Sequence, residues 1–204
     1  MKKRLEDTRN LIDEYKGLSN EEVFERLEQK RNSLEVAIEN VSHDFNAGTI
    51  VRNANNFNVS KVHIIGRRKY NRRGAMCTDK YLEVVYWEKV ADFVADQRSR
   101  GQELVAIENN IGELRDENGD LILDKTGEPL KERPLEEKRF EAKTTLIFGG
   151  ESDGLTEDIL KNCDDIREIT NYGSTRSVNV GVASGIAMYE WARQQGSKGL
   201  ALED

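Results

Sequence analysis

Short apolar runs alternate with helix-like stretches from about residue 34 onward, and this alternation limits the possible folds more than any other feature of the chain. Strand-like runs occur at 34–38, 62–66, 104–107 and 145–150, with weaker ones at 82–86 and 166–169. Helical patterns lie between most of them, at 49–58, 88–100, 156–162 and 178–194. Buried strands separated by helices are typical of a parallel sheet, so we predict an α/β fold with helices on both faces of the sheet.

Two parts of the chain depart from this rhythm. Residues 1–32 carry mixed charges and predict two helices, the second of which begins at a capping box formed by Ser19 and Glu22. Residues 110–132 contain Asn-Gly and Thr-Gly turn signals around a short apolar run and predict a hairpin insertion. We therefore expect an N-terminal helical extension followed by one domain, 33–204, that contains the insertion.

The charges are distributed unevenly. The chain has 31 basic and 38 acidic side chains, a net charge of −7, yet the 34 positions between Asp44 and Asp79 hold seven basic residues and no acidic one. Such a segment predicts a local phosphate-binding surface for RNA or DNA, with Tyr70 available to stack on a base. The alternative is an ordinary solvated loop. The densest basic residues are Arg67, Arg68, Lys69, Arg72 and Arg73.

Several functional classes lack their sequence signals. No Gly-rich dinucleotide or nucleotide loop and no zinc-protease motif is found. No run approaches the ~18 apolar residues that would span a bilayer. The two cysteines, Cys77 and Cys163, have no metal-ligand spacing. We expect a cytoplasmic protein without a metal site and without membrane insertion.

Polar, Gly- and Asn-rich segments follow three of the predicted strands, at 42–52, 149–156 and 170–179. Ligands of parallel sheets bind at the carboxyl ends of the strands, so these segments predict the site. We place Arg52 in the first turn of its helix, where the macrodipole disfavours a cation by roughly 0.3–1 kcal/mol. An anionic ligand would explain its position, and an ion pair with Glu151 is the alternative. His63 is expected inside the sheet, while His43 is a weak ligand candidate.

Together, the three segments resemble the motifs of the SpoU (TrmH-type) branch of the SPOUT RNA methyltransferases. The first motif runs from Asn46 through Arg52 to Ala54, and the second from Phe148 to Leu155. The third consists of Ile169 and Gly173 followed by residues 177–180, Ser-Val-Asn-Val. All three occur in the family's order, and the resemblance covers about residues 34–194.

The resemblance implies transfer of a methyl group from S-adenosylmethionine to a ribose 2′-OH of tRNA or rRNA. It also implies a deep trefoil knot in the C-terminal part and a homodimer. The matching catalytic positions are Asn46, Arg52, Glu151, Ser177 and Asn179. The matching cofactor positions are Ile107, Gly149, Gly150, Ile169 and Val178.

The alternatives are an rRNA substrate, methylation of a base nitrogen, or an RNA-binding protein that kept the fold without activity. The helical extension resembles that of tRNA enzymes, so tRNA is favoured. Thr170 replaces a frequent proline of the family, but no catalytic side chain is lost. Small residues at Gly181 and Gly185 on the 178–194 helix predict that this helix contributes to the dimer interface.

Overall fold

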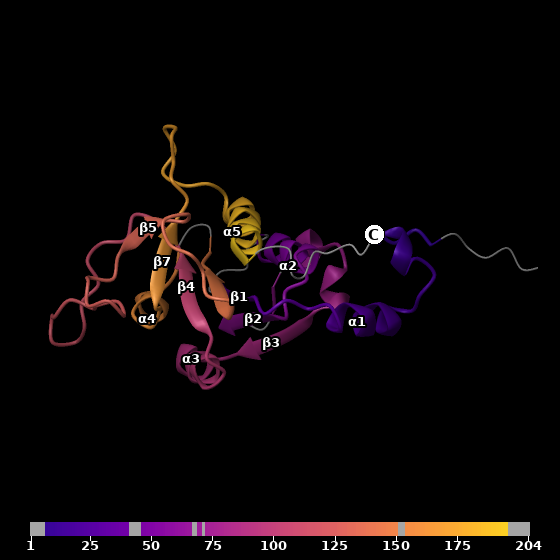
Figure 1. Cartoon of the computed structure of the whole chain (residues 1–204), viewed down its shortest axis with the longest axis horizontal. Coiled ribbons are helices and arrows are strands. Elements are labelled where there is room, and N and C mark those ends of the chain that lie inside the picture. Colours follow the sequence, from indigo (N-terminus) through magenta and orange to yellow (C-terminus); the bar gives the residue numbers. More distant parts are fainter. Residues whose placement is uncertain (1–6, 41–45, 67–68, 71, 151–153, 196–204) are drawn as a thin grey trace, which may run out of the picture.

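The computed structural model describes residues 7–40, 46–66, 69–70, 72–150 and 154–195. These residues form a seven-stranded, all-parallel sheet with strand order β3-β2-β1-β6-β4-β7-β5 (Figure 1). The strands are β1 (Glu35–Asn40), β2 (Lys61–Gly66), β3 (Glu83–Trp87), β4 (Glu103–Ile107), β5 (Glu132–Pro134), β6 (Thr144–Phe148) and β7 (Asp165–Glu168). The predicted parallel α/β sheet is therefore confirmed.

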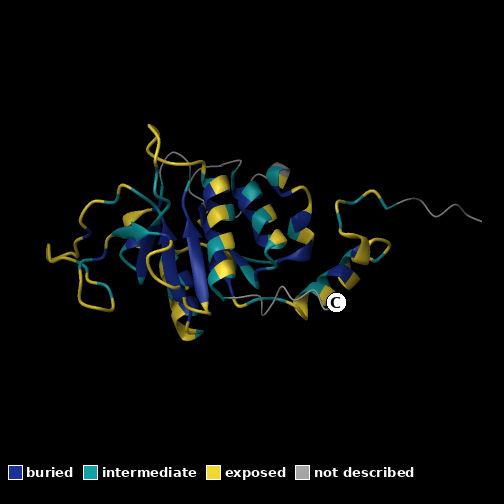
Figure 2. Cartoon of the chain, turned by 45° about the horizontal axis from the view of Figure 1, so that its top comes forward, coloured by how far each residue is buried: buried dark blue, intermediate teal, exposed yellow. Residues whose placement is uncertain are grey.

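Helices cover both faces of the sheet, as predicted. Alternate strand residues face two separate apolar clusters: Val36 and Ile38 face one, while Ala37 faces the other. The first cluster lies beneath α2 (Asn46–Asn56) and α5 (Val180–Gln195), and the second beneath α3 (Val90–Ser99) and α4 (Glu157–Leu160). The two helices of the first cluster pack against each other (Figures 1 and 2).

The strand order positions the site. β6 lies between β1 and β4, although β4 precedes β6 in the chain, and β7 then adds on the far side of β4. The carboxyl ends of these four strands consequently meet at one edge of the sheet, where ligands of parallel sheets bind. This order is compatible with the knot that the resemblance implies, and the knot itself stays a prediction.

Residues 7–32 contain one α-helix rather than two. A single 3₁₀ turn, η1 (Asp13–Tyr15), precedes α1 (Asn20–Glu28). The predicted capping box is confirmed: the Glu22 N–H donates to Ser19 Oγ at 3.1 Å, and the Ser19 N–H donates to Glu22 Oε2 at 2.7 Å. α1 packs near η3 (Thr78–Tyr81), which follows η2 (Arg72–Ala75) in the connection between β2 and β3.

The connection after β4 differs from a single hairpin. Two isolated antiparallel bridges, Arg115 with Leu121 and Leu123 with Pro129, close two successive turns. The chain then forms β5, a strand that the sequence pattern did not predict. β5 pairs with β7 on one side only, and a strand at the edge of a sheet tolerates a proline such as Pro134.

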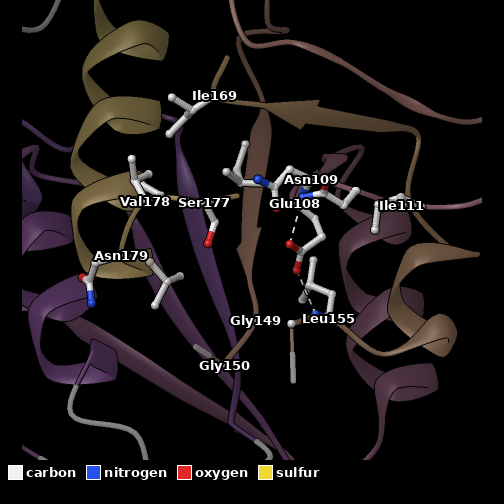
Figure 3. A pocket seen from close by; sticks show the side chains of 15 residues that line it. Glu108, Asn109, Ile111, Gly149, Gly150, Leu155, Ile169, Ser177, Val178 and Asn179 are labelled. Atoms are coloured by element: carbon white, nitrogen blue, oxygen red, sulfur yellow. Dashed lines mark hydrogen bonds between the residues drawn. The ribbon is translucent and has the colours of Figure 1, made fainter. Parts of the chain in front are cut away.

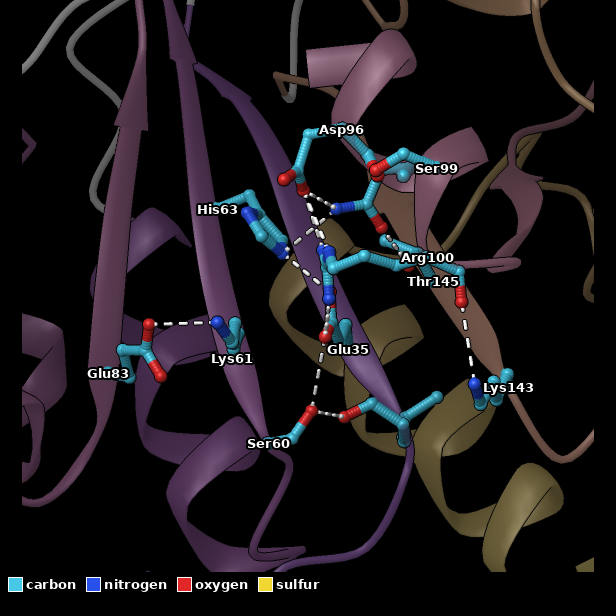
Figure 4. Close-up of polar contacts among 12 residues, drawn as sticks. Glu35, Ser60, Lys61, His63, Glu83, Asp96, Ser99, Arg100, Lys143 and Thr145 are labelled. Atoms are coloured by element: carbon cyan, nitrogen blue, oxygen red, sulfur yellow. Dashed lines mark hydrogen bonds and ion pairs between the residues drawn. The ribbon is translucent and has the colours of Figure 1, made fainter.

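A buried polar network crosses the face of the sheet beneath α3 (Figure 4). Arg100 donates two hydrogen bonds to the Glu35 carboxylate, and the His63 ring lies 2.7 Å from Glu35 Oε2. The Trp87 indole N–H can only donate, so His63 accepts it at Nδ1 and donates from Nε2. Burial alone would raise the pKa of the Glu35 carboxyl, but the hydrogen bonds from His63 and Arg100 outweigh burial and lower this pKa to about 2. The network explains why His63 is buried within a strand, as the sequence indicated.

Candidate active site

A pocket of about 460 Å³ opens at the carboxyl ends of β4 and β6 and at the start of α5 (Figure 3). This volume lies within the range of small-molecule cofactor sites. Five of its lining residues are those that the sequence assigned to a cofactor: Ile107, Gly149, Gly150, Ile169 and Val178. The structure thus brings together four separate segments of the chain, and the roles of these residues stay predictions.

The segment that follows β6 requires glycine. A Cβ added at Gly149 would lie 2.2 Å from the carbonyl carbon of Gly154, so any side chain there would force the backbone apart. Gly150 and Gly154 exchange two backbone hydrogen bonds, of 3.3 and 3.0 Å, that fold the segment back on itself. Gly154 has a φ of 64°, which L side chains rarely adopt. Bare backbone therefore forms this wall of the pocket, and a ligand can approach its N–H and C=O groups closely.

Two of the predicted catalytic side chains line the same pocket, Ser177 and Asn179. The Asn179 side chain begins α5, because its Oδ1 accepts the Gly181 N–H at 2.9 Å. Its Nδ2 donates to Asn46 Oδ1 at 3.1 Å. The first and third motifs, more than a hundred residues apart in the chain, are thereby joined side chain to side chain. Glu151 lies outside the described residues.

Arg52 requires a correction. α2 begins at Asn46, three residues earlier than predicted, so Arg52 lies in the second turn of the helix and the macrodipole argument for it was wrong. Its side chain is exposed and makes no hydrogen bond or ion pair with the part of the chain that the structure describes. Glu151, the partner in the alternative ion pair, lies outside the described residues, so the anion-binding role of Arg52 stays a prediction.

Asn53 was missed as a positioning residue. Its Nδ2 donates to the Gly181 carbonyl and to Ser184 Oγ, both at 2.9 Å, and so joins α2 to α5. The sequence signal was present, because an asparagine on the apolar side of a helix needs a buried partner.

The basic segment packs against the start of α2. A Cβ at Gly74 would lie 2.8 Å from the Thr49 backbone nitrogen, so η2 contacts the first turn of the helix that carries Arg52. Lys69 and Arg72 are exposed, and Arg72 pairs with Asp79, the acidic residue that ends the basic window. The Arg73 side chain and the whole of Arg67, Arg68 and His43 lie outside what the structure describes.

Tyr70 does not serve the role expected from the sequence. Its side chain belongs to the apolar cluster beneath α2 and α5, with only 7% of its surface exposed. A ring in that position anchors the basic segment to the core and cannot stack on a base.

Gly181 of α5 packs tightly within the chain, while the predicted contribution of this helix to a dimer interface stays a prediction. A Cβ at Gly181 would lie 2.9 Å from Thr49 Cγ2, and one at Gly185 would lie 3.4 Å from Asn53 Nδ2. Gly181 therefore allows α5 to approach α2 closely, whereas the space at Gly185 would accept a Cβ. Their apolar neighbours remain on the outer face of α5, with exposed fractions of 55% for Val182, 39% for Ile186 and 62% for Tyr189.

Three polar side chains of the pocket lining were absent from the sequence-based assignment: Glu108, Asn109 and Asn110. They follow β4 directly, so the strand-end rule applied to that strand would have found them. Asn109 and Asn110, together with Asn171, all donate side-chain hydrogen bonds to the Arg176 carbonyl, which holds the segment between β7 and α5 near the pocket.

The described residues were also searched for membrane-spanning helices and for metal-binding groups of side chains. None of their helices is long and apolar enough to cross a membrane. Within the same set, no three His, Cys, Asp or Glu side chains are grouped so that they could hold a metal ion.

Comparisons with known proteins agree with the geometry. The chain is 26% identical over 187 residues to the tRNA (guanosine(18)-2′-O)-methyltransferase of Escherichia coli K12, covering 89% of this chain and 72% of that protein. It is 26% identical to a 23S rRNA (guanosine-2′-O-)-methyltransferase of Haemophilus ducreyi, and the match covers 90% of this chain and 69% of that protein. The crystal structure of the A. aeolicus TrmH/SpoU tRNA modifying enzyme superposes on this chain with a TM-score of 0.67 at 25% sequence identity. The superposition covers 89% of this chain and 86% of that one. The profile of the SpoU rRNA methylase family matches residues 33–189, and the chain belongs to that family.

Proposed function

We propose that this protein transfers a methyl group from S-adenosylmethionine to a ribose 2′-OH of RNA. The observation that carries the proposal is the junction of the cofactor-sized pocket with the Asn46–Asn179 pair, beside the helix that carries Arg52. The glycine wall at Gly149 and Gly150 fits a cofactor that is held largely by backbone groups. Family membership and the named 2′-O-methyltransferases among the relatives support the same reaction.

The chemistry requires positioning more than activation of the methyl group. When bound, S-adenosylmethionine supplies an electrophilic methyl group on its sulfonium. The residues of this chain have to align the 2′-oxygen and help it to lose its proton as it takes up the methyl group. Asn46, Ser177 and Asn179 offer neutral hydrogen bonds for ribose and phosphate oxygens.

Arg52 has a different role from these neutral groups. Its guanidinium stays charged at any physiological pH, so we assign it to a phosphate or to the developing 2′-oxyanion rather than to proton removal. We assign the Glu151 carboxylate, which matches a catalytic position of the family, to orienting the reacting groups.

We infer that the substrate class is tRNA, with rRNA as the alternative. We also infer that the protein acts in the cytoplasm. The relatives include enzymes named for each RNA, and the helical N-terminal segment favours tRNA. The test is transfer from cofactor labelled on its methyl group to purified tRNA and, separately, to deproteinised rRNA. We expect label in tRNA. Label in rRNA alone would reverse the assignment, and label in neither would contradict the proposed activity on both classes.

We also propose a homodimer that forms through the outer face of α5. Three exposed apolar side chains, Val182, Ile186 and Tyr189, lie along this helix at helical spacing and require cover from another surface. The resemblance implies a dimer whose RNA site draws on both subunits, which fits the exposed position of Arg52 on α2, the helix that packs against α5.

A further inference from the structure

Glu108 places a fixed carboxylate in the wall of the cofactor pocket. It is the first residue after β4, and Figure 3 shows its carboxylate pointing toward Leu155. The Asn109 N–H donates to Oε1 at 3.0 Å, and the Leu155 N–H donates to Oε2 at 3.1 Å. One backbone donor on each oxygen holds the group in place and leaves further lone pairs free for a ligand.

The room for this carboxylate depends on Gly154. A Cβ at that position would lie 2.7 Å from Glu108 Oε2, closer than real Cβ contacts come. The positive φ of Gly154 also disfavours any other residue there. The glycine segment after β6 and the residue after β4 therefore fit together as one wall.

The charge of Glu108 has no cationic partner within the described structure. It is the one charged side chain among the described residues that line the pocket, and no described Lys, Arg or His pairs with it. Two buried carboxylates of this protein have cationic partners, Glu35 with Arg100 and Asp165 with Arg167. Two others, Glu39 and Glu103, accept neutral hydrogen bonds and form no ion pair with a described residue. The half-buried Glu108 differs from both groups because it lines a pocket. An unpaired charge in a partly enclosed pocket is unfavourable unless a ligand brings the opposite charge.

We propose that Glu108 makes the pocket selective for the sulfonium form of the cofactor over the product of methyl transfer. This inference rests on the proposed function. S-Adenosylmethionine carries an ammonium, a carboxylate and a sulfonium, so its net formal charge is about +1. S-Adenosylhomocysteine has lost the sulfonium charge and is neutral overall. A fixed negative charge in the pocket therefore attracts the cofactor more strongly than the product. The difference favours product release after transfer.

The size of the effect follows from Coulomb's law. In a half-open pocket, where the effective dielectric constant lies between that of water and that of a protein surface, the attraction between two nearby unit charges changes an equilibrium constant by about tenfold. This interaction does not need direct contact, so it differs from a hydrogen bond to the ribose hydroxyls or to the ammonium. Both of those groups are present in cofactor and product alike.

The test is calorimetric binding of three ligands without RNA: S-adenosylmethionine, S-adenosylhomocysteine and sinefungin, which bears an amine in place of the methyl sulfonium. In Glu108→Gln we expect about tenfold weaker binding of the two cationic ligands and a change of less than about threefold for the product. Glu108→Asp keeps the charge and should keep most of the selectivity. Glu117→Gln is the matched control, because it removes an exposed carboxylate outside the pocket lining and should change nothing.

Three outcomes separate the possibilities. An equal loss for all three ligands would show that Glu108 binds a group common to them, and would overturn the selectivity. Unchanged affinities in Glu108→Gln would overturn it as well, provided that thermal unfolding shows a folded variant. If the wild-type protein binds neither cofactor nor product, the proposed function itself fails.

Discussion

Glu35 provides a stability test that can be worked out from the structure. Its carboxyl pKa falls from 4.5 in the unfolded chain to about 2 in the folded protein, because His63 and Arg100 stabilise the charged form against the cost of burial. A lowered folded-state pKa stabilises the protein above the unfolded-state pKa, and this contribution is lost as pH falls through the folded-state value. Between pH 7 and pH 3, the loss from this one group is about 2 kcal/mol of the free energy of unfolding.

The perturbation is Glu35→Gln, and the assay is urea unfolding at pH 7 and at pH 3. We expect the wild type to lose about 2 kcal/mol more than the variant over this interval. Glu83→Gln is the control: it removes an exposed carboxylate paired with Lys61 on the neighbouring strands and should cost less than about 1 kcal/mol (Figure 4). Equal losses for the wild type and Glu35→Gln would refute the assignment of Glu35 as a charged, hydrogen-bonded group.

Three further predictions concern the active site, the basic segment and the dimer. Arg52→Ala should abolish methyl transfer while cofactor affinity in calorimetry stays within about threefold, since Arg52 lies outside the pocket lining; near-normal turnover would remove it from the mechanism. Ile186→Arg should convert the dimer to a monomer in sedimentation and reduce activity in parallel, whereas a fully active monomer would contradict the α5 interface. Replacing the arginines of the basic segment with alanine should weaken RNA binding for all sequences. It should also reduce the slope of log affinity against log salt by about 0.7–0.9 per lost phosphate contact. An unchanged slope would exclude the segment from RNA binding. The positions for that variant are Arg67, Arg68, Arg72 and Arg73.

The sheet was predictable because its inner strands are continuous apolar runs. β5 was not, because its three residues, Glu132 to Pro134, are polar or unable to donate a backbone hydrogen bond. Its strand character comes from pairing with β7, a tertiary contact that local sequence does not encode. The start of α2 was placed too late for a related reason. Gly48 lowers helix propensity, but tertiary packing supports this first turn, since Gly74 lies against the Thr49 backbone.

The sequence predicted site residues where polar motifs follow strands. It did not predict features that depend on how side chains pack in the folded protein. Ser177, Asn179 and the glycines after β6 were assigned because their segments follow strands and match family motifs, and the structure brings them together in one pocket. Tyr70 was misjudged because a tyrosine among basic residues gives no sign of whether its ring is buried. The fit between Glu108 and Gly154 depends on the order in which β4 and β6 enter the sheet, which sequence alone does not show.

The central claim is that the methyl group reaches a ribose oxygen. Alkaline hydrolysis of RNA proceeds through the free 2′-OH, so a methylated 2′-oxygen protects the adjoining phosphodiester bond. RNA labelled by this protein from methyl-labelled S-adenosylmethionine should therefore release its label in alkali-resistant dinucleotides. Label recovered in ordinary mononucleotides, with the methyl group on a base, would contradict the account.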